Sequence, residues 1–181
     1  MIRRPHAAAA LLALALAACG EEAKAPKTAD EVIAEAGEME RPDPGRYETK
    51  VELLEFSVPG LPPEQADRLK SMMGGVGAQA STYCLTAQEA GKGFEEQVRK
   101  MGQGQGGLEC EYNEFDVNRG KLAAEMTCTG PQGMNAAMKI DGKTTSRSTS
   151  MTMDMTQKAA MIPGGEMKMK MKMDSTRVGD C

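Results

Sequence analysis

Hydrophobic and polar residues alternate with a period of two along the last part of the chain. Residues 148–157 read STSMTMDMTQ, and residues 166–174 read EMKMKMKMD. Successive side chains of a β-strand point to opposite faces, so strict alternation predicts a strand with one apolar and one polar face. We therefore expect two strands that each gather their methionines on one face and their Lys, Thr and Asp residues on the other.

These two segments also predict how they pair. We expect an antiparallel hairpin in which Asp154 lies opposite Lys168 on the polar face. The methionine pairs on the apolar face are predicted to be Met155 with Met167, Met153 with Met169, and Met151 with Met171. Such cross-strand pairs contribute about 0.2–1 kcal/mol each. A shift of one residue would set methionine against lysine, whereas a shift of two preserves both faces. A two-residue turn at Pro163-Gly164 would impose an odd shift, so a longer loop or a bulge is expected there.

Helices are predicted upstream by capping boxes, in which a threonine is followed three residues later by a glutamate. Thr28 with Glu31 predicts a short helix over residues 29–36, and Thr86 with Glu89 predicts a longer helix. The longer helix carries one apolar stripe at helical spacing, formed by Ala90, Phe94, Val98 and Met101. A further helix is expected after residue 62, and the apolar residues on its face are Ala66, Leu69, Met72 and Met73.

The remaining segments have the composition of strands. They are residues 46–58, residues 81–86, both halves of residues 110–128, and residues 134–140. Asn118-Arg119-Gly120 and Asp141-Gly142 are typical of hairpin turns. The sequence thus predicts an α+β fold, with a twisted antiparallel sheet of about six or seven strands and two helices packed on one face.

Four cysteines, besides one near the N-terminus, predict two disulfides. A hairpin centred on Arg119 sets Cys110 opposite Cys128, at a separation that suits a disulfide. Cys84 then pairs with Cys181 by elimination. Four free thiols or a zinc site are the alternatives, and the lack of CxxC spacing disfavours zinc. In the chain-entropy model the two bridges contribute about 3 and about 4.7 kcal/mol.

The N-terminus has the features of a bacterial lipoprotein signal. Arg3 and Arg4 precede the apolar residues 7–18, a stretch too short to span a bilayer, which needs about 20 residues. Leu16-Ala17-Ala18-Cys19 resembles a lipobox, so we expect lipid on Cys19 and a signal peptide over residues 1–18. By resemblance to sorted lipoproteins, Gly20 favours the periplasmic face of the outer membrane. Residues 19–45 are predicted to be a tether containing the short helix, and residues 46–181 a single domain.

Removal of the signal peptide changes the charge and the available chemistry. Loss of Arg3 and Arg4 leaves 20 basic against 26 acidic residues, which does not favour nucleic acid as a partner. Loss of His6 leaves no histidine in the mature chain and excludes histidine triads and histidine metal sites. No pair of carboxylates has a spacing that indicates catalysis. We therefore expect a protein that is not an enzyme and needs no cofactor.

The methionine-rich face has three interpretations. The first is an ordinary buried sheet face, and the second is a pliable pocket for lipid or another hydrophobic ligand, since methionine adapts to irregular shapes. The third is a soft-metal site, because thioethers favour Cu(I). Its ligands would be Met151, Met153, Met155, Met167, Met169 and Met171. Against a metal site, successive residues on one face of a strand lie about 7 Å apart, so the ligands would have to converge across strands.

Short motifs in a fixed order resemble one family. They are RPDPGRYET at 41–49, VPGLP at 58–62, YCLT at 83–86, Cys110, Cys128, and RVGDC at 177–181. Together they resemble the domain of unknown function thirty-six seventeen, a family of small proteobacterial envelope proteins. The resemblance implies an exported protein, often a lipoprotein, with cysteines at matching positions and no assigned activity. We expect a lipid-anchored envelope protein that binds a small hydrophobic ligand or an envelope protein. The alternative is a periplasmic buffer for Cu(I) or oxidants.

Overall fold

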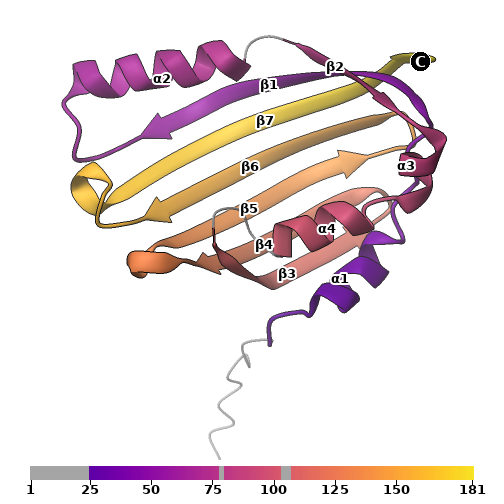
Figure 1. Cartoon of the computed structure of the whole chain (residues 1–181), viewed down its shortest axis with the longest axis horizontal. Coiled ribbons are helices and arrows are strands. Elements are labelled where there is room, and N and C mark those ends of the chain that lie inside the picture. Colours follow the sequence, from indigo (N-terminus) through magenta and orange to yellow (C-terminus); the bar gives the residue numbers. More distant parts are fainter. Residues whose placement is uncertain (1–24, 78–79, 103–106) are drawn as a thin grey trace, which may run out of the picture.

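The computed structural model describes residues 25–77, 80–102 and 107–181. In these ranges the chain forms one open antiparallel sheet of seven strands in the spatial order β2-β1-β7-β6-β5-β4-β3 (Figure 1). The strands are β1 (Gly45–Ser57), β2 (Ser81–Leu85), β3 (Glu109–Asn118), β4 (Lys121–Thr129), β5 (Asn135–Thr144), β6 (Ser148–Lys158) and β7 (Glu166–Gly179). The helices are α1 (Ala29–Ala36), α2 (Pro63–Gly77), α3 (Ala87–Lys92) and α4 (Glu95–Gly102). The predicted fold class is confirmed.

Helix α1 begins at the capping box that the sequence predicts. The hydroxyl of Thr28 accepts a hydrogen bond from the Glu31 amide, and the Glu31 carboxylate accepts one from the Thr28 amide at 2.7 Å. The sequence places this helix in a tether, but the structure packs it into the core, because Val32 is completely buried. The amide of Lys27 also donates to the Tyr112 carbonyl of β3 at 2.7 Å. Among the described residues, the folded part therefore begins near Lys27 and not at residue 46.

The hydrophobic core lies between α1, α4 and the part of the sheet formed by β3, β4 and β5. Its buried members are Val32, Ala36, Met39, Val98, Tyr112, Phe115, Ala124, Met126 and Ile140. The Tyr112 hydroxyl donates a hydrogen bond of 2.8 Å to the carbonyl of Val98 in α4. Burial raises the pKa of the Tyr112 phenol above its usual value. This bond fixes α4 against β3.

The single helix predicted after Thr86 is divided in two. Its capping box is present, with the Glu89 carboxylate accepting from the Thr86 amide at 2.9 Å. Gly93 then adopts φ 59°, a left-handed conformation that suits glycine and ends α3. Helix α4 starts two residues later in a new direction, and this places Val98 in the core. The residues of the apolar stripe were therefore predicted to lie on one helix, whereas the chain forms two helices here.

The β3–β4 hairpin confirms the predicted cysteine pair, although its turn differs from the prediction. Arg119 and Gly120 form a two-residue turn, and both have positive φ angles, 50° and 75°. That turn alone would not set Cys110 opposite Cys128. An extra residue, Asn113, is inserted in β3 between Tyr112 and Glu114 and shifts the register by one. The cysteines thereby become directly opposed, with their Cα atoms 4.0 Å apart.

The second disulfide joins the C-terminus, just after β7, to the edge strand β2. Cys84 of β2 is bonded to Cys181, with Cα atoms 5.7 Å apart and a sequence separation of 97. Both predicted pairings are thus present. Tyr83, next to Cys84, stacks on Tyr47 of β1 with ring centroids 5.6 Å apart. The short edge strand β2 is held to the sheet by both contacts.

The turn predicted at Asp141-Gly142 is wrong. Both residues lie inside β5, and the connection to β6 is formed by residues 145–147. Gly142 is opposite Met151 in β6 and Leu122 in β4. A Cβ added at Gly142 would lie 2.6 Å from Cγ of Met151. This glycine therefore makes room for a methionine and does not form a turn.

The predicted hairpin of β6 and β7 is present, with a register two residues away from the prediction. Met155 lies opposite Met169, whereas the sequence analysis expected Met167. Asp154 accordingly lies opposite Lys170 and not Lys168. The shift preserves both faces, as any even shift does. It also sets Lys158 against Glu166, whose side chains form an ion pair at 3.7 Å. The connecting loop spans residues 159–165 and contains a short 3₁₀ turn, so the expectation of a longer loop is confirmed.

Candidate functional site

Three rows of apolar side chains cross the sheet from β1 to β3. Directly opposed residues of antiparallel strands lie on the same face, so the rows follow from the pairing. The rows are Val51–Met173–Met151–Gly142–Leu122–Val117, Leu53–Met171–Met153–Ile140–Ala124–Phe115, and Phe56–Met169–Met155–Met138–Met126–Tyr112. All the methionines of the final hairpin that belong to these rows lie on this one face. The central prediction from the alternating sequence is therefore confirmed.

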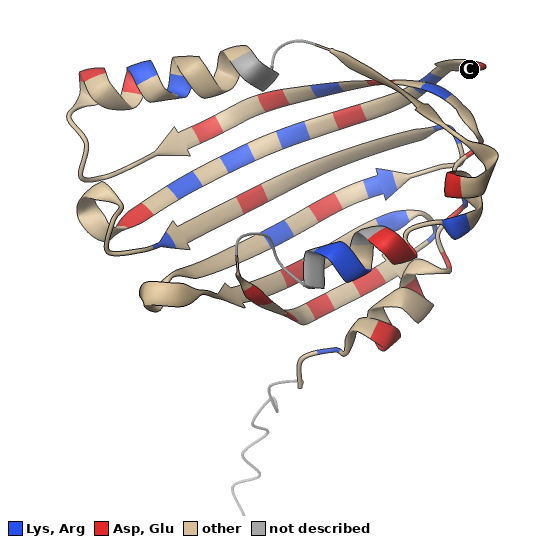
Figure 2. Cartoon of the chain, in the orientation of Figure 1, with Lys and Arg blue, Asp and Glu red and all other residues tan. Residues whose placement is uncertain are grey.

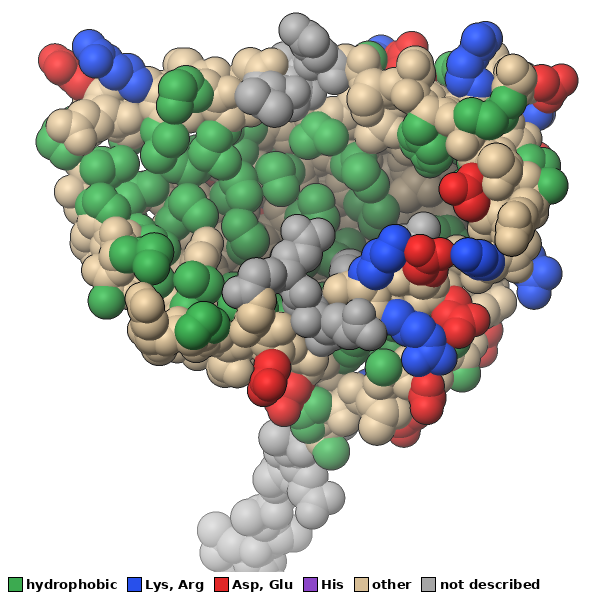
Figure 3. Space-filling view, in the orientation of Figure 1, with side chains coloured by type: hydrophobic (Ala, Val, Ile, Leu, Met, Phe, Trp, Pro, Cys, Tyr) green, Lys and Arg blue, Asp and Glu red, His purple; other side chains and the backbone are tan. Residues whose placement is uncertain are grey.

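Helices cover only part of this apolar face. Over β3, β4 and β5 the rows lie under α1 and α4, and Phe115, Met126 and Ile140 are buried. Over β6, β7 and β1 the side chains are only half-buried, and Met155 and Met171 are typical of them. Figure 3 shows this region as a hollow lined with hydrophobic side chains, between the rim that carries α2 and the rim that carries α4. We call this half-buried region the methionine face. Its residues are Val51, Leu53, Phe56, Met151, Met153, Met155, Met169, Met171 and Met173.

Phe56 belongs to the methionine face because of a bulge in β1. Val51 and Leu53 have odd positions, and strict alternation would turn Phe56 to the other side of the sheet. The register shifts between Leu53 and Glu55, so Leu54 is an extra residue and Phe56 comes to lie opposite Met169. Residues 46–58 were predicted as a strand, but simple alternation within it does not place Phe56 beside Val51 and Leu53. The bulge lies inside an apolar segment, so no pattern in the sequence reveals it.

Charged residues alternate with those of the methionine face along the same strands (Figure 2), and on the opposite face of the sheet several of them are paired. Lys170 of β7 forms an ion pair with Asp154 of β6 at 3.2 Å, and Lys172 forms one with Asp174 at 2.8 Å. Hydrogen bonds from Lys172 and from Ser150 hold the pKa of the Asp174 carboxyl below its usual value. The same contact raises the pKa of Lys172. The lysines of the MKMKMKM segment thus face water and make ion pairs along their own strand and with the neighbouring strand.

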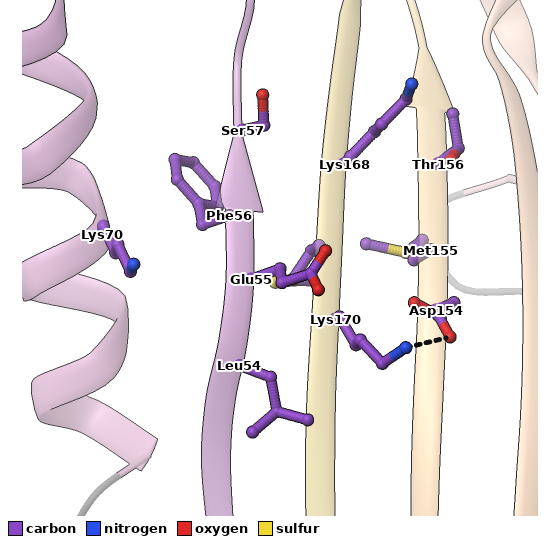
Figure 4. A pocket seen from close by; sticks show the side chains of 11 residues that line it. Leu54, Glu55, Phe56, Ser57, Lys70, Asp154, Met155, Thr156, Lys168 and Lys170 are labelled. Carbon is purple, nitrogen blue, oxygen red and sulfur yellow. Dashed lines mark ion pairs between the residues drawn. The ribbon is translucent and has the colours of Figure 1, made fainter.

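A shallow depression of 390 Å³ lies beside α2, where polar and apolar residues of β1, β7 and β6 meet (Figure 4). Lys70 reaches toward it from α2, and Glu55, Lys168 and Lys170 come from the sheet. Figure 4 also shows the Phe56 ring pointing from β1 toward α2. Charges of both signs alternate in this depression, and Asp154 is already paired with Lys170. The arrangement resembles the rest of the charged face and offers no group specialised for chemistry.

The six methionines predicted as a soft-metal set are only partly brought together. Met151, Met153 and Met155 lie opposite Met173, Met171 and Met169, so five of the six predicted residues lie within these cross-strand pairs. Met167 instead faces Gln157. Within residues 25–77, 80–102 and 107–181, no group of three or more His, Cys, Asp or Glu side chains could hold a metal ion. What these methionines share is an apolar, pliable surface.

The remaining predicted site residues are accounted for as follows. Cys84, Cys110, Cys128 and Cys181 are in the two disulfides. Cys19, the predicted lipid attachment site, lies outside the described residues, as do residues 1–18, which were predicted to be a signal peptide. No described helix is long and apolar enough to cross a membrane.

The class defined by this geometry is an open antiparallel sheet with one partly covered apolar face and two disulfides. A family model described as "Protein of unknown function (DUF3617)" matches residues 42–181, and the chain belongs to that family. The match covers the whole sheet and all four disulfide cysteines. Comparison with curated proteins gave no significant match, and neither did comparison with solved structures.

Proposed function

We propose that this protein is a noncatalytic, lipid-anchored envelope protein whose methionine face binds an elongated apolar ligand of the acyl-chain class. The observation that supports the proposal is the incomplete cover of this face. An apolar sheet face is normally packed against another layer. Here the rows that α1 and α4 cover over β3 to β5 continue, only half-buried, across β6, β7 and β1. Contiguous apolar surface of this kind marks binding sites in soluble proteins.

The chemistry of the face favours an acyl chain over a rigid or polar ligand. The methionine side chains are unbranched and flexible, so they can follow a chain that itself has many conformers. A row of hydroxyl groups borders the apolar rows at one end, where Thr49 lies opposite Ser175 and Ser175 lies opposite Thr149. The Thr49 hydroxyl donates to the Ser175 hydroxyl at 2.9 Å. An apolar surface with a polar border suits a molecule with an apolar body and a polar end.

The proposed anchor would keep this surface near a source of such ligands. Lipid on Cys19 would hold the chain at the outer membrane, on its periplasmic side. Lys27 is fixed to the edge of β3. The eight residue-to-residue steps from Cys19 to Lys27 can span at most about 29 Å. Lys27, where the folded part begins, would therefore stay within that distance of the membrane surface, from which acyl chains can be taken.

A paired substitution on β6 tests the binding site. Met155 lies on the methionine face, and the next residue, Thr156, lies on the polar face opposite Lys168. Met155→Glu places a charge where the acyl chain should lie, whereas Thr156→Glu adds the same charge to the other side. Binding is measured by displacement of a fluorescent fatty acid with palmitate. We expect saturable binding that is weakened at least tenfold by Met155→Glu and is unchanged by Thr156→Glu.

Other outcomes contradict the proposal. Absence of saturable palmitate binding, or equal loss in both variants, would remove the methionine face as the ligand site. Capture of an envelope protein that is abolished by Met155→Glu alone would instead identify a protein partner on the same surface. The anchor is tested separately by Cys19→Ser, which should move the protein from the outer-membrane fraction to the soluble periplasmic fraction. Retention of the variant in the membrane fraction would contradict lipid attachment at Cys19.

A further inference from the structure

Helix α2 forms one rim of the hollow over the methionine face and is the least buried of the longer elements. It packs against β1 at the end of the sheet order where α1 and α4 do not lie (Figure 1). Of its described side chains, residues 63–75, none is buried. Ala66, Leu69 and Met73 share one side of the helix and are half-buried, and Met72 beside them is 67% exposed. An amphipathic helix normally buries its apolar stripe, so α2 retains apolar surface that the observed packing leaves unused.

The two ends of α2 are held very differently. The segment before the helix is fixed, because Val58 is buried and its carbonyl accepts a 3.0 Å hydrogen bond from the Leu61 amide. The Gly60 backbone packs directly on Gly164 of the β6–β7 loop, where an added Cβ would clash with the Gly164 nitrogen. Near the other end, an added Cβ at Gly74 or Gly75 would meet no atom of the described residues within 4 Å, apart from the backbone of its own helix. Consecutive glycines are poor helix formers and are common sites of bending.

We propose that α2 is a hinged cover that closes over the methionine face when an acyl chain occupies it. This inference rests on the proposed function. The segment of residues 58–62 is the pivot, and Gly74 and Gly75 absorb the change in backbone direction. In the open arrangement, apolar surface remains exposed on both the helix and the sheet. A bound acyl chain supplies apolar surface that the helix and the sheet can contact at once. Closure therefore removes more apolar surface from water than either contact alone. Met72, which is exposed in the open arrangement, becomes buried against the ligand.

The chain offers a clean test because it contains no tryptophan. Met72→Trp places a single reporter on α2, and Met161→Trp places a matched reporter on the β6–β7 loop, where the native side chain is 70% exposed. Stearate is added to each purified variant, and emission maxima are recorded. Dibromostearate, which quenches nearby tryptophan, is then added in a second titration. Binding of stearate to both variants is measured independently by displacement of a fluorescent fatty acid.

We expect stearate to shift the Met72→Trp emission to shorter wavelength and dibromostearate to quench it, with neither effect in Met161→Trp. Binding of stearate without any change at Met72→Trp would overturn the cover while leaving the binding site intact. Equal changes in both variants would also overturn it, because they would indicate general association with the exposed surface. Failure of stearate to bind either variant would overturn the proposed function and the cover with it.

A second variant tests the hinge without altering the face. Alanine at positions 74 and 75 would clash with no described residue outside its own helix, so Gly74→Ala combined with Gly75→Ala should fold normally and stiffen this end of α2. In the Met72→Trp background we expect a smaller blue shift and a several-fold faster dissociation of stearate. An unchanged shift together with an unchanged dissociation rate would contradict the role of the two glycines.

Discussion

Gly142 of β5 lies directly opposite Met151 of β6, and the absence of a side chain at Gly142 is what allows Met151 to lie on the apolar face of the sheet. An added Cβ would also lie 3.0 Å from the Ser150 carbonyl oxygen, so movement of the Met151 side chain alone would not relieve the crowding. The glycine is thus a packing residue in the middle of a strand.

Substitution of Gly142 by valine should therefore destabilise the protein. Overpacking in a close-packed region typically costs about 1–3 kcal/mol. The loss in the free energy of unfolding is measured by urea denaturation. The double variant with Met151→Ala should recover part of it, because the truncated side chain leaves room for the valine. Equal costs of Gly142→Val in the presence and absence of Met151 would show that the two positions do not interact.

The two disulfides should differ in their contribution to stability. In the chain-entropy model, a bridge that closes a loop of nearly a hundred residues contributes about 4.7 kcal/mol, and one that closes fewer than twenty contributes about 3 kcal/mol. The first corresponds to Cys84–Cys181 and the second to Cys110–Cys128. Replacing each pair by serines and measuring denaturant unfolding should give the larger loss for Cys84–Cys181. A larger loss for Cys110–Cys128 would contradict the ranking by loop length.

The Tyr112 phenol should make stability decrease at alkaline pH. Burial raises its pKa in the folded protein, so its contribution is fully present below the unfolded pKa, near 10, and is lost as the pH rises through the higher folded value. Tyr112→Phe removes the bond to Val98 and should cost about 1 kcal/mol at pH 8. The difference in stability between the native protein and this variant should shrink above pH 10. A difference that stays constant with pH would contradict this assignment.

Replacement of methionine by leucine separates the apolar-ligand proposal from the Cu(I) alternative. Leucine at positions 151, 153 and 155 preserves volume and apolarity but removes three sulfur atoms. We expect palmitate affinity to change by less than a few-fold, and anaerobic titration to give no saturable Cu(I) binding tighter in the native protein than in the variant. Tight Cu(I) binding that is lost in the leucine variant would favour the metal buffer.

The architecture could be predicted from the sequence where local patterns decide it. Alternation in the last two strands fixed which side chains share a face, because strand periodicity is independent of the partner. The capping boxes at Thr28 and Thr86 identified two helix starts, since they satisfy orphan amides locally. The match of Cys110 with Cys128 was also correct, but there a two-residue turn and a bulge at Asn113 combine to give the predicted pair.

The features that could not be predicted depend on partners distant in sequence. Asp141-Gly142 has the composition of a turn, and only the crowding by Met151 shows why glycine is needed inside a strand. The two possible even registers of β6 with β7 preserve the same faces, so the sequence did not distinguish between them. The partial cover of the methionine face could not be predicted from the sequence either, because it depends on where α1, α2 and α4 pack. Residues 29–36 look like part of a polar tether until Val32 is seen inside the core.

The most direct test of the methionine face is an NMR measurement on methionine methyl groups. The protein is labelled with ¹³C at the methionine ε-methyl positions, and a spin-labelled stearate is added. A spin label bound on the face should broaden the signals of Met153, Met155, Met169 and Met171, while Met39, which is buried in the core, and Met161, on the β6–β7 loop, stay sharp. Uniform broadening, or broadening of Met161 with the four sheet methionines unaffected, would contradict an acyl-binding surface on this side of the sheet.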